Sequence, residues 1–278
     1  MDWVSSDFCD RVYHLLFKSS IRGLQEATSS RTWRDSAEYH LGKRVNVRFF
    51  EEKDGSGLLS FIRPLAEVKE SAYARMTTLS VTNRYFIEQR VLEALPYLTT
   101  DDDSRFELWR LEESVHLTIL REVHSIGCLF TAIESFPCIS PLSVQFLKKH
   151  IDRGILKKVR FSEGWRQQHA GLIKKLIIQN QLVKFRSDAS SALEIDLKTT
   201  KKLIEVTRNG PRTTRSVEVN VKCSVEEMKK YLKETGFADF IDTSRCQYHP
   251  QLILVDVGLT ISLLEKRIIL VQTPPEDA

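Results

Sequence analysis

The spacing of apolar residues changes near Gly42, and this change limits the folds open to the chain. Before Gly42, apolar residues recur every three or four positions, as they do on one face of an amphipathic helix. After it, residues 45–49 alternate between apolar and polar side chains, as in a half-buried strand. The sequence therefore predicts a helical module over 1–43 and a mixed α/β domain over 44–278.

Three short helices are predicted in the module. The apolar stripe of the first helix consists of Val4, Phe8, Val12, Leu15 and Leu16. The second helix lies around Ile21 and Leu24, and the third carries Trp33 and stops at Gly42. Three such helices bury little surface by themselves, so they need a partner or the rest of the chain.

The first part of the α/β domain is predicted from strand and turn signals. Residues 45–62 resemble a hairpin with a D-G-S-G turn at 54–57. A strand at 76–81 and a helix at 86–95 should follow. The acidic segment Asp101–Ser104 is predicted to be a loop.

From residue 105 the chain repeats a strand-plus-helix unit. The strand-like runs are 105–110, 156–161, 182–186 and 216–221, and the clearest helical patterns are 162–178, 192–207 and 224–233. The last three strands begin 26 and then 34 residues apart, a spacing typical of leucine-rich-repeat βα units. No full repeat motif is present, so a general α/β layer fold stays open.

Strand-like runs between residues 252 and 271 predict a β-hairpin that closes the end of the sheet. The predicted fold class is therefore α+β to α/β. It comprises a small three-helix module, irregular leucine-rich-repeat-like βα units and a C-terminal β-hairpin cap.

The net charge of +4 conceals an uneven distribution. Residues 148–215 hold 17 Lys and Arg against 6 Asp and Glu, a net +11, which leaves −7 for the remainder. The candidate basic surface residues are Lys157, Lys158, Lys174 and Lys175. They are either the solvated faces of helices or a surface that attracts an acidic partner or nucleic acid. The interleaved rings of Phe161, Trp165 and Phe185 fall at core positions, which favours packing over base stacking.

The usual local motifs of dinucleotide, P-loop, hydrolase and zinc-protease chemistry are absent, so we expect no enzyme, cofactor or metal. His124 and Cys128, with His116 nearby, resemble a metal pair but lack a suitably spaced fourth ligand. Asp101–Asp103 lack the alternate spacing of a calcium loop. Cys9 is expected to pack as a small hydrophobic residue.

The sequence predicts a cytoplasmic or nuclear protein without a membrane partner. The first twenty residues lack the basic and apolar regions of a signal peptide, and no apolar stretch approaches 18 residues. Five widely spread cysteines without a C-x-x-C pair indicate a reduced compartment.

The opening pattern M-D-x-V-x-x-x-F-C-D-x-V-x-x-L-L over Met1–Leu16, with Trp33 on the third helix, resembles the F-box-like and F-box-associated families of nematodes. Val4–Asp7 replace the Leu-Pro-x-Glu opening of a standard F-box. Irregular βα units follow in those families, often with a tryptophan before an apolar helix. Trp165 and the apolar residues at 172–182 are similar to that arrangement.

This resemblance implies a non-enzymatic protein-interaction adaptor, like the substrate-recruitment subunits of cullin-RING ubiquitin ligases. Its partners would be a Skp-type adaptor protein and a protein substrate recognised by the βα units. The implied partner-binding residues are Val4, Phe8, Val12, Leu15, Leu16 and Trp33. Two alternatives remain open: these residues pack on the α/β domain instead, or the chain binds nucleic acid with its basic 148–215 face.

Overall fold

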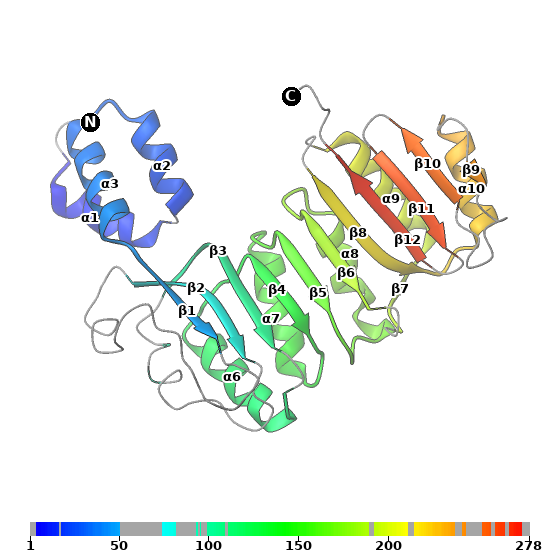
Figure 1. The fold of residues 1–278 in the computed structure, drawn as a ribbon, viewed down its shortest axis with the longest axis horizontal. Helices are drawn as coiled ribbons and strands as arrows, with labels where there is room; N and C mark the ends of the chain where they lie inside the picture. The colour runs from blue at the N-terminus through cyan, green and yellow to red at the C-terminus, as the bar shows by residue number, and fades with distance from the viewer. Residues whose placement is uncertain are drawn as a thin grey trace. The chain divides into compact units, whose positions relative to one another are not determined.

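The computed structural model describes residues 4–16, 18–50, 74–81, 93, 95, 99–108, 111–188, 192–210, 214–236, 241–242, 252–256, 259–264 and 267–273. The chain forms two compact units, Met1–Ala132 and Ile133–Ala278. Both contain helices and parallel strands, and the second unit ends in antiparallel strands, so the predicted mixed α/β class is confirmed (Figure 1).

Three helices open the first unit. They are α1 (Ser6–Leu15), α2 (Lys18–Ala27) and α3 (Arg31–Lys43). The Ser5 side chain caps α1 by accepting a hydrogen bond from the Phe8 N–H at 3.3 Å. The three predicted helices are therefore confirmed. The proposed domain boundary between residues 43 and 44 falls where α3 ends, inside this first unit, and stays a prediction.

A parallel sheet follows the three helices. Its strands are β1 (Val45–Phe50), β2 (Ala74–Val81) and β3 (Thr99–Leu108), and helix α6 (Glu113–Ser125) comes next. Both β1 and β3 pair with β2 in parallel, and β2 confirms the predicted strand at 76–81. The predicted turn and second strand at 54–62 lie outside the described residues, as does most of the predicted helix at 86–95.

The predicted loop at Asp101–Ser104 is wrong, because this segment belongs to β3. Thr100 pairs with Met76, and the next register pair joins Arg105 to Thr78. The acidic segment therefore stands opposite a single residue of β2 and bulges out of the hydrogen-bonded ladder. Asp has a low strand propensity, and this is why the sequence pattern indicated a loop.

Strands and helices alternate through most of the second unit. In chain order they are β4 (Ala132–Phe136), α7 (Pro141–Asp152), β5 (Lys158–Phe161), the 3₁₀ turn η2 (Gln167–His169), α8 (Ala170–Ile177), β6 (Lys184–Ser187), β7 (Glu194–Ile195), α9 (Leu197–Asn209), β8 (Arg215–Val221) and α10 (Val225–Glu234). The strand order is β4, β5, β6 and β8, and β7 also pairs with β8. Helices α7, α8 and α9 lie on one face of this sheet (Figure 1).

The three predicted strands of the second unit are confirmed by β5, β6 and β8, and the predicted helices by α8, α9 and α10. Strand β4 and helix α7 did not stand out in the sequence. Glu134 interrupts the apolar run of the five-residue β4. Helix α7 carried a usable start signal, since Pro141 occupies its first turn directly after Ser140.

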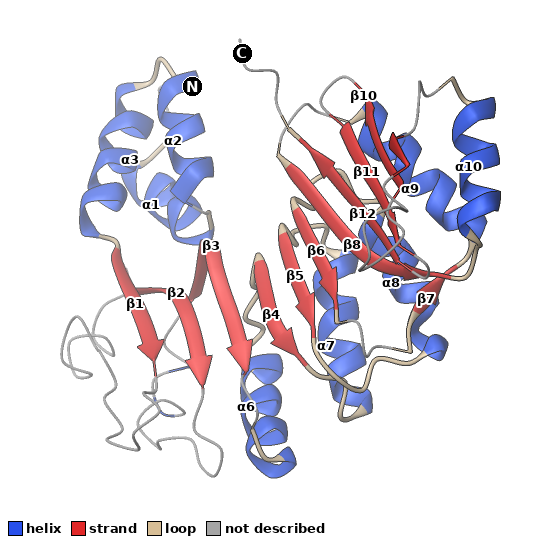
Figure 2. Cartoon of the chain, turned by 45° about the vertical axis from the view of Figure 1, so that its right-hand side comes forward, coloured by secondary structure: helices blue, strands red, loops and turns tan. Residues whose placement is uncertain are grey.

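Antiparallel strands end the chain. They are β9 (Ile241–Asp242), β10 (Leu252–Asp256), β11 (Leu259–Leu264) and β12 (Arg267–Gln272). Strand β12 pairs with β8, and β11 and β10 continue the same sheet side by side (Figure 2). The predicted C-terminal hairpin thus extends the edge of the parallel strands.

Trp165 is central to the core of the second unit, with 1% of its surface exposed. Its ring stacks on Phe161 with a centroid distance of 4.3 Å, and Phe185 meets Phe161 edge-on. The indole Nε1–H donates a hydrogen bond to the Phe136 carbonyl at 2.8 Å. Trp165 therefore joins the ends of β4 and β5, and its polar atom is satisfied inside the core.

Candidate functional site

The three N-terminal helices have a small core of their own. Cys9, Tyr13, Ile21 and Ala37 are fully buried, and they come from all three helices. The Tyr13 hydroxyl donates a hydrogen bond to the Trp33 carbonyl at 2.9 Å. Burial raises the pKa of the Cys9 thiol, so this cysteine is a packed neutral group, as the sequence predicted.

Polar contacts tie α1 to α3. The buried His40 ring places Nε2 at 2.6 Å from Asp10 Oδ1. Just after α3, the Arg44 guanidinium donates hydrogen bonds to the carbonyls of Tyr13 and Leu16 at the end of α1. The two Arg44 hydrogen bonds give additional partners to carbonyl groups at the end of α1, where the regular intrahelical hydrogen bonds stop. They hold the two helices in one arrangement.

Several large apolar side chains of these helices face solvent. Phe8 is 53% exposed, Tyr39 51% and Leu24 39%. Among the described residues, Ile178 is the single other large apolar side chain in this exposed class, so such residues concentrate on the N-terminal helices. The Phe8 ring meets Trp33 edge-on with a centroid distance of 6.2 Å. An exposed aromatic ring supported by a second, half-buried ring is a suitable anchor for a protein partner.

The structure divides the predicted partner-binding residues into two groups. Phe8 is exposed, whereas Val4, Leu16 and Trp33 are partly buried and pack against the small core. Val12 is half-buried on α1. Leu15 lies at the end of α1, but its side chain is outside the described part of the structure. The spacing of α1 therefore located the stripe, but it did not separate core-facing from solvent-facing members.

Two further exposed residues, Leu24 and Tyr39, were not among the predicted partner-binding residues. Leu24 lies on α2 and Tyr39 on α3, next to the buried His40. Both residues are apolar and lie outside the core-facing positions of their helices. That sequence signal could have identified Leu24 and Tyr39 as partner-binding candidates.

The four candidate basic residues do not share one face. Lys158 is exposed in β5, and Lys157 is exposed just before that strand. Lys174 and Lys175 lie on α8, in the helix layer behind the strands in Figure 1. The rings of Phe161, Trp165 and Phe185 are at most 1% exposed, so packing accounts for them, as the sequence favoured.

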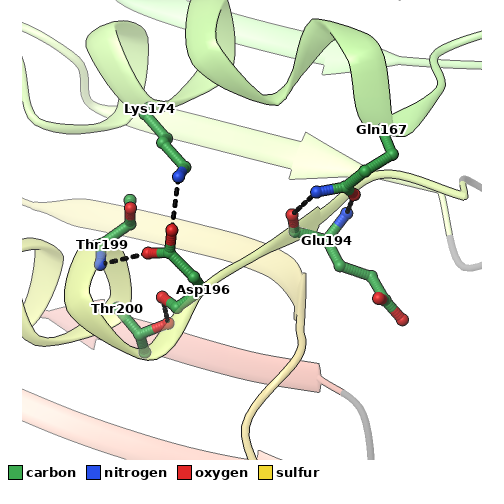
Figure 3. A network of polar contacts seen from close by, with 6 residues as sticks. All are labelled: Gln167, Lys174, Glu194, Asp196, Thr199 and Thr200. Atoms are coloured by element: carbon green, nitrogen blue, oxygen red, sulfur yellow. Dashed lines mark hydrogen bonds and ion pairs between the residues drawn. The ribbon is translucent and has the colours of Figure 1, made fainter.

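Lys174 belongs to a polar network that joins consecutive βα units (Figure 3). Its Nζ lies 2.5 Å from Asp196 Oδ2, while Asp196 Oδ1 accepts a hydrogen bond from the Thr199 N–H and so caps α9. The Gln167 side chain donates to the Glu194 carbonyl and accepts from the Glu194 N–H. The contact with Lys174 holds the pKa of the Asp196 carboxyl well below its usual range, and the hydrogen bonds from Thr199 each contribute less to this shift.

We expect Asp196→Ala to lower the free energy of unfolding of the second unit by about 1 to 2 kcal/mol at pH 7, since it removes the cap of α9. A depressed Asp pKa stabilises the folded state above the unfolded value near 4, so the difference from wild type should shrink below that pH. Urea titrations at pH 7 and pH 3 measure both effects. The control Asp152→Ala, which breaks an exposed surface pair with Lys148, should lower the stability clearly less than Asp196→Ala does. Equal losses in the two variants would contradict the capping role.

A surface hollow of about 590 Å³ lies at the ends of β4 and β5. Cys138 Sγ in this hollow is 3.9 Å from His169 Nε2. The Arg166 backbone N–H donates a hydrogen bond to His169 Nδ1 at 3.2 Å, and the Gln168 side-chain nitrogen lies 3.2 Å from His169 Nε2. Both ring nitrogens therefore have a nitrogen donor at hydrogen-bond distance, closer than the Cys138 sulfur.

The electrostatics of this hollow agree with its geometry. Burial raises the pKa of the Cys138 thiol, although Arg166 opposes the shift. Burial, assisted by Arg166, lowers the pKa of His169. Both shifts favour a neutral thiol beside a neutral imidazole over the thiolate–imidazolium ion pair of an activated cysteine.

The other candidate ligands, His116, His124 and Cys128, lie on or just after α6. His116 and Cys128 are buried, and burial lowers the pKa of His116 to about 4. Within the described ranges, no three His, Cys, Asp or Glu side chains come together in an arrangement suited to a metal ion. No helix in the described part of the chain has the length and apolar character needed to cross a membrane.

Comparison with protein-family models, with curated proteins and with solved structures finds no match to this chain. Its candidate site must therefore be judged by its own geometry.

Proposed function

We propose that this chain is a non-enzymatic protein-interaction adaptor of the F-box-like kind. Its N-terminal helices would bind a Skp-type adaptor of a ubiquitin ligase, and its second unit, a set of irregular leucine-rich-repeat-like βα units, would hold a protein substrate. The observation that carries this proposal is the exposed Phe8 ring, supported edge-on by Trp33 on a module with its own small core. This arrangement fits the F-box-like opening of the sequence and provides an apolar anchor.

The βα region supports the second half of the proposal. Its parallel strands present one face to the helices, and no described helix covers the other face, which is how repeat proteins present a surface to partners. A cytoplasmic or nuclear location follows from the same proposal.

Nucleic-acid binding through the basic 148–215 region is the alternative proposal. It has less support, because the aromatic rings of this region are buried and cannot stack on bases. The candidate lysines also lie partly on strands and partly on helices rather than along one track.

Capture of the full-length chain by an immobilised Skp-type adaptor tests the proposal. We expect Phe8→Asp to weaken binding at least about tenfold, since it places a carboxylate in an apolar contact. The same variant should unfold close to the wild-type midpoint, because Phe8 is 53% exposed.

Arg22→Asp is the matched control, since Arg22 is exposed on α2 of the same module. It should retain wild-type binding. Absence of wild-type binding, or equal binding by Phe8→Asp, would refute the adaptor role.

A further inference from the structure

The uncovered face of the second unit's sheet carries a concentration of positive charge. Along β5 and β6, Val159, Phe161 and Phe185 point into the core. The alternating positions Lys158, Arg160, Lys184 and Arg186 therefore point to the opposite face. The helices lie on the core side, so these four cationic side chains are not covered by them (Figure 1).

The strand register sorts these cations into two rows. In one row, Arg160 pairs with Arg186, and Arg186 pairs with Glu218 of β8. Each guanidinium of this row has an acidic neighbour. The Arg160 guanidinium lies 3.9 Å from Asp188, and the Arg186 guanidinium lies 3.1 Å from Glu218, which it shares with Arg267 of β12 at 2.7 Å.

The other row is not neutralised. Lys158 stands directly beside Lys184, and Lys184 stands beside Ser216 of β8. Both lysines are exposed, and within the described part of the chain neither ammonium group has a hydrogen bond or an ion pair. Like charges directly opposite each other on neighbouring strands destabilise a sheet. An anionic group placed between the two lysines would remove this repulsion.

An apolar strip lies on the same face, beyond β8. Val271 of β12 pairs with Ser216, and Ile269 pairs with Glu218. Both side chains are half-exposed, while their neighbours Ile268 and Leu270 are buried on the helix side. Counting contacts among the described residues alone, the face therefore offers two cations without an ion pair and, two strands away, an apolar contact.

We propose that this face, defined by Lys158, Lys184, Ile269 and Val271, docks an acidic segment of a protein partner that also carries an apolar side chain. The acidic side chains would lie over the two lysines and the apolar side chain over β12. Residues paired on neighbouring strands are about 5 Å apart at the backbone, so the two lysines can reach one or two carboxylates of a partner. A nucleic-acid backbone requires a longer track of cations. This inference rests on the proposed function in one respect: it identifies the docked partner with the substrate that the adaptor recruits.

A direct test uses full-length protein and a fluorescein-labelled peptide of Glu-Glu-Leu repeats, with fluorescence anisotropy as the readout. We expect binding that weakens with added salt, and a loss of about tenfold in affinity for the double variant K158E/K184E. The matched control K175E/K198E changes the net charge equally with exposed lysines of α8 and α9, and it should bind as wild type does.

Three outcomes would overturn the proposal: no binding of the peptide, equal losses in the two double variants, or tighter binding of an oligothymidine probe that K158E/K184E abolishes. Adaptor capture in the same variants separates this inference from the proposed function. If K158E/K184E loses the peptide but the wild type never binds the adaptor, the docking surface stands and the adaptor role fails.

Discussion

Trp165→Ala is expected to lower the free energy of unfolding of the second unit by about 4 kcal/mol, because it empties a fully packed aromatic position. Trp165→Phe should cost much less, about 1 kcal/mol. That variant loses the indole donor, but the Phe136 carbonyl still accepts a hydrogen bond from the Ser162 N–H at 3.2 Å. Urea unfolding followed by circular dichroism measures both values.

Phe8→Ala is the control for Trp165→Ala, since it removes an aromatic ring that is 53% exposed. It should change stability by less than about 1.5 kcal/mol, the upper value of an edge-on ring contact. If Trp165→Ala lowers the free energy of unfolding by less than about 1 kcal/mol, Trp165 does not join the two strand ends as described.

Lowering the pH from 7 to 4 is expected to destabilise the first unit by about 3 kcal/mol through His116 alone. Burial lowers the pKa of this histidine to about 4 in the folded protein, whereas the unfolded chain has the ordinary value near 6.5. Between these values the unfolded state binds the proton and the folded state does not. The stabilisation is therefore complete above pH 6.5 and is lost as the pH falls towards 4.

His116→Gln provides the comparison, because glutamine stays neutral across this range. The variant should be less stable than wild type at pH 7, and the gap should narrow steadily towards pH 4. Thermal or urea unfolding at four pH values measures the gap. If the two proteins lose stability in parallel, His116 does not titrate in the way its burial indicates.

The proposed adaptor has separate surfaces for its two partners. The helical module presents Phe8, Leu24 and Tyr39, which suit an apolar contact. The second unit presents the paired lysines of β5 and β6, which suit an acidic one. The two surfaces have opposite chemistry, so variants at one are not expected to affect binding at the other.

The apolar spacing of the sequence was sufficient to locate most elements around these surfaces. The stripe of α1, the strands β5, β6 and β8 and the helices that follow them all have clear periods of 3.6 or 2. The segment at 101–104 was not located, because three consecutive Asp residues have a low strand propensity and a bulge lies outside the regular strand period.

The candidate partner site was only partly visible in the sequence. The stripe of α1 identified Phe8, but it gave the same weight to Val4 and Leu16, which pack against the module's own core. The exposure of Tyr39 depends on how α3 packs against α1, and that packing involves residues some 30 positions apart, such as Asp10 and His40.

By itself, the sequence determined the local elements, the change of period after Gly42 and the basic excess of residues 148–215. Only the tertiary structure decided that Lys158 stands beside Lys184 while Lys174 pairs with Asp196. The physical reason is that a strand's period shows which side chains share a face, but not which strand lies next to it or which face the helices cover. Long-range packing sets the register of neighbouring strands and decides which face of the sheet the helices cover. These two properties determine which charged and aromatic side chains are available to a partner.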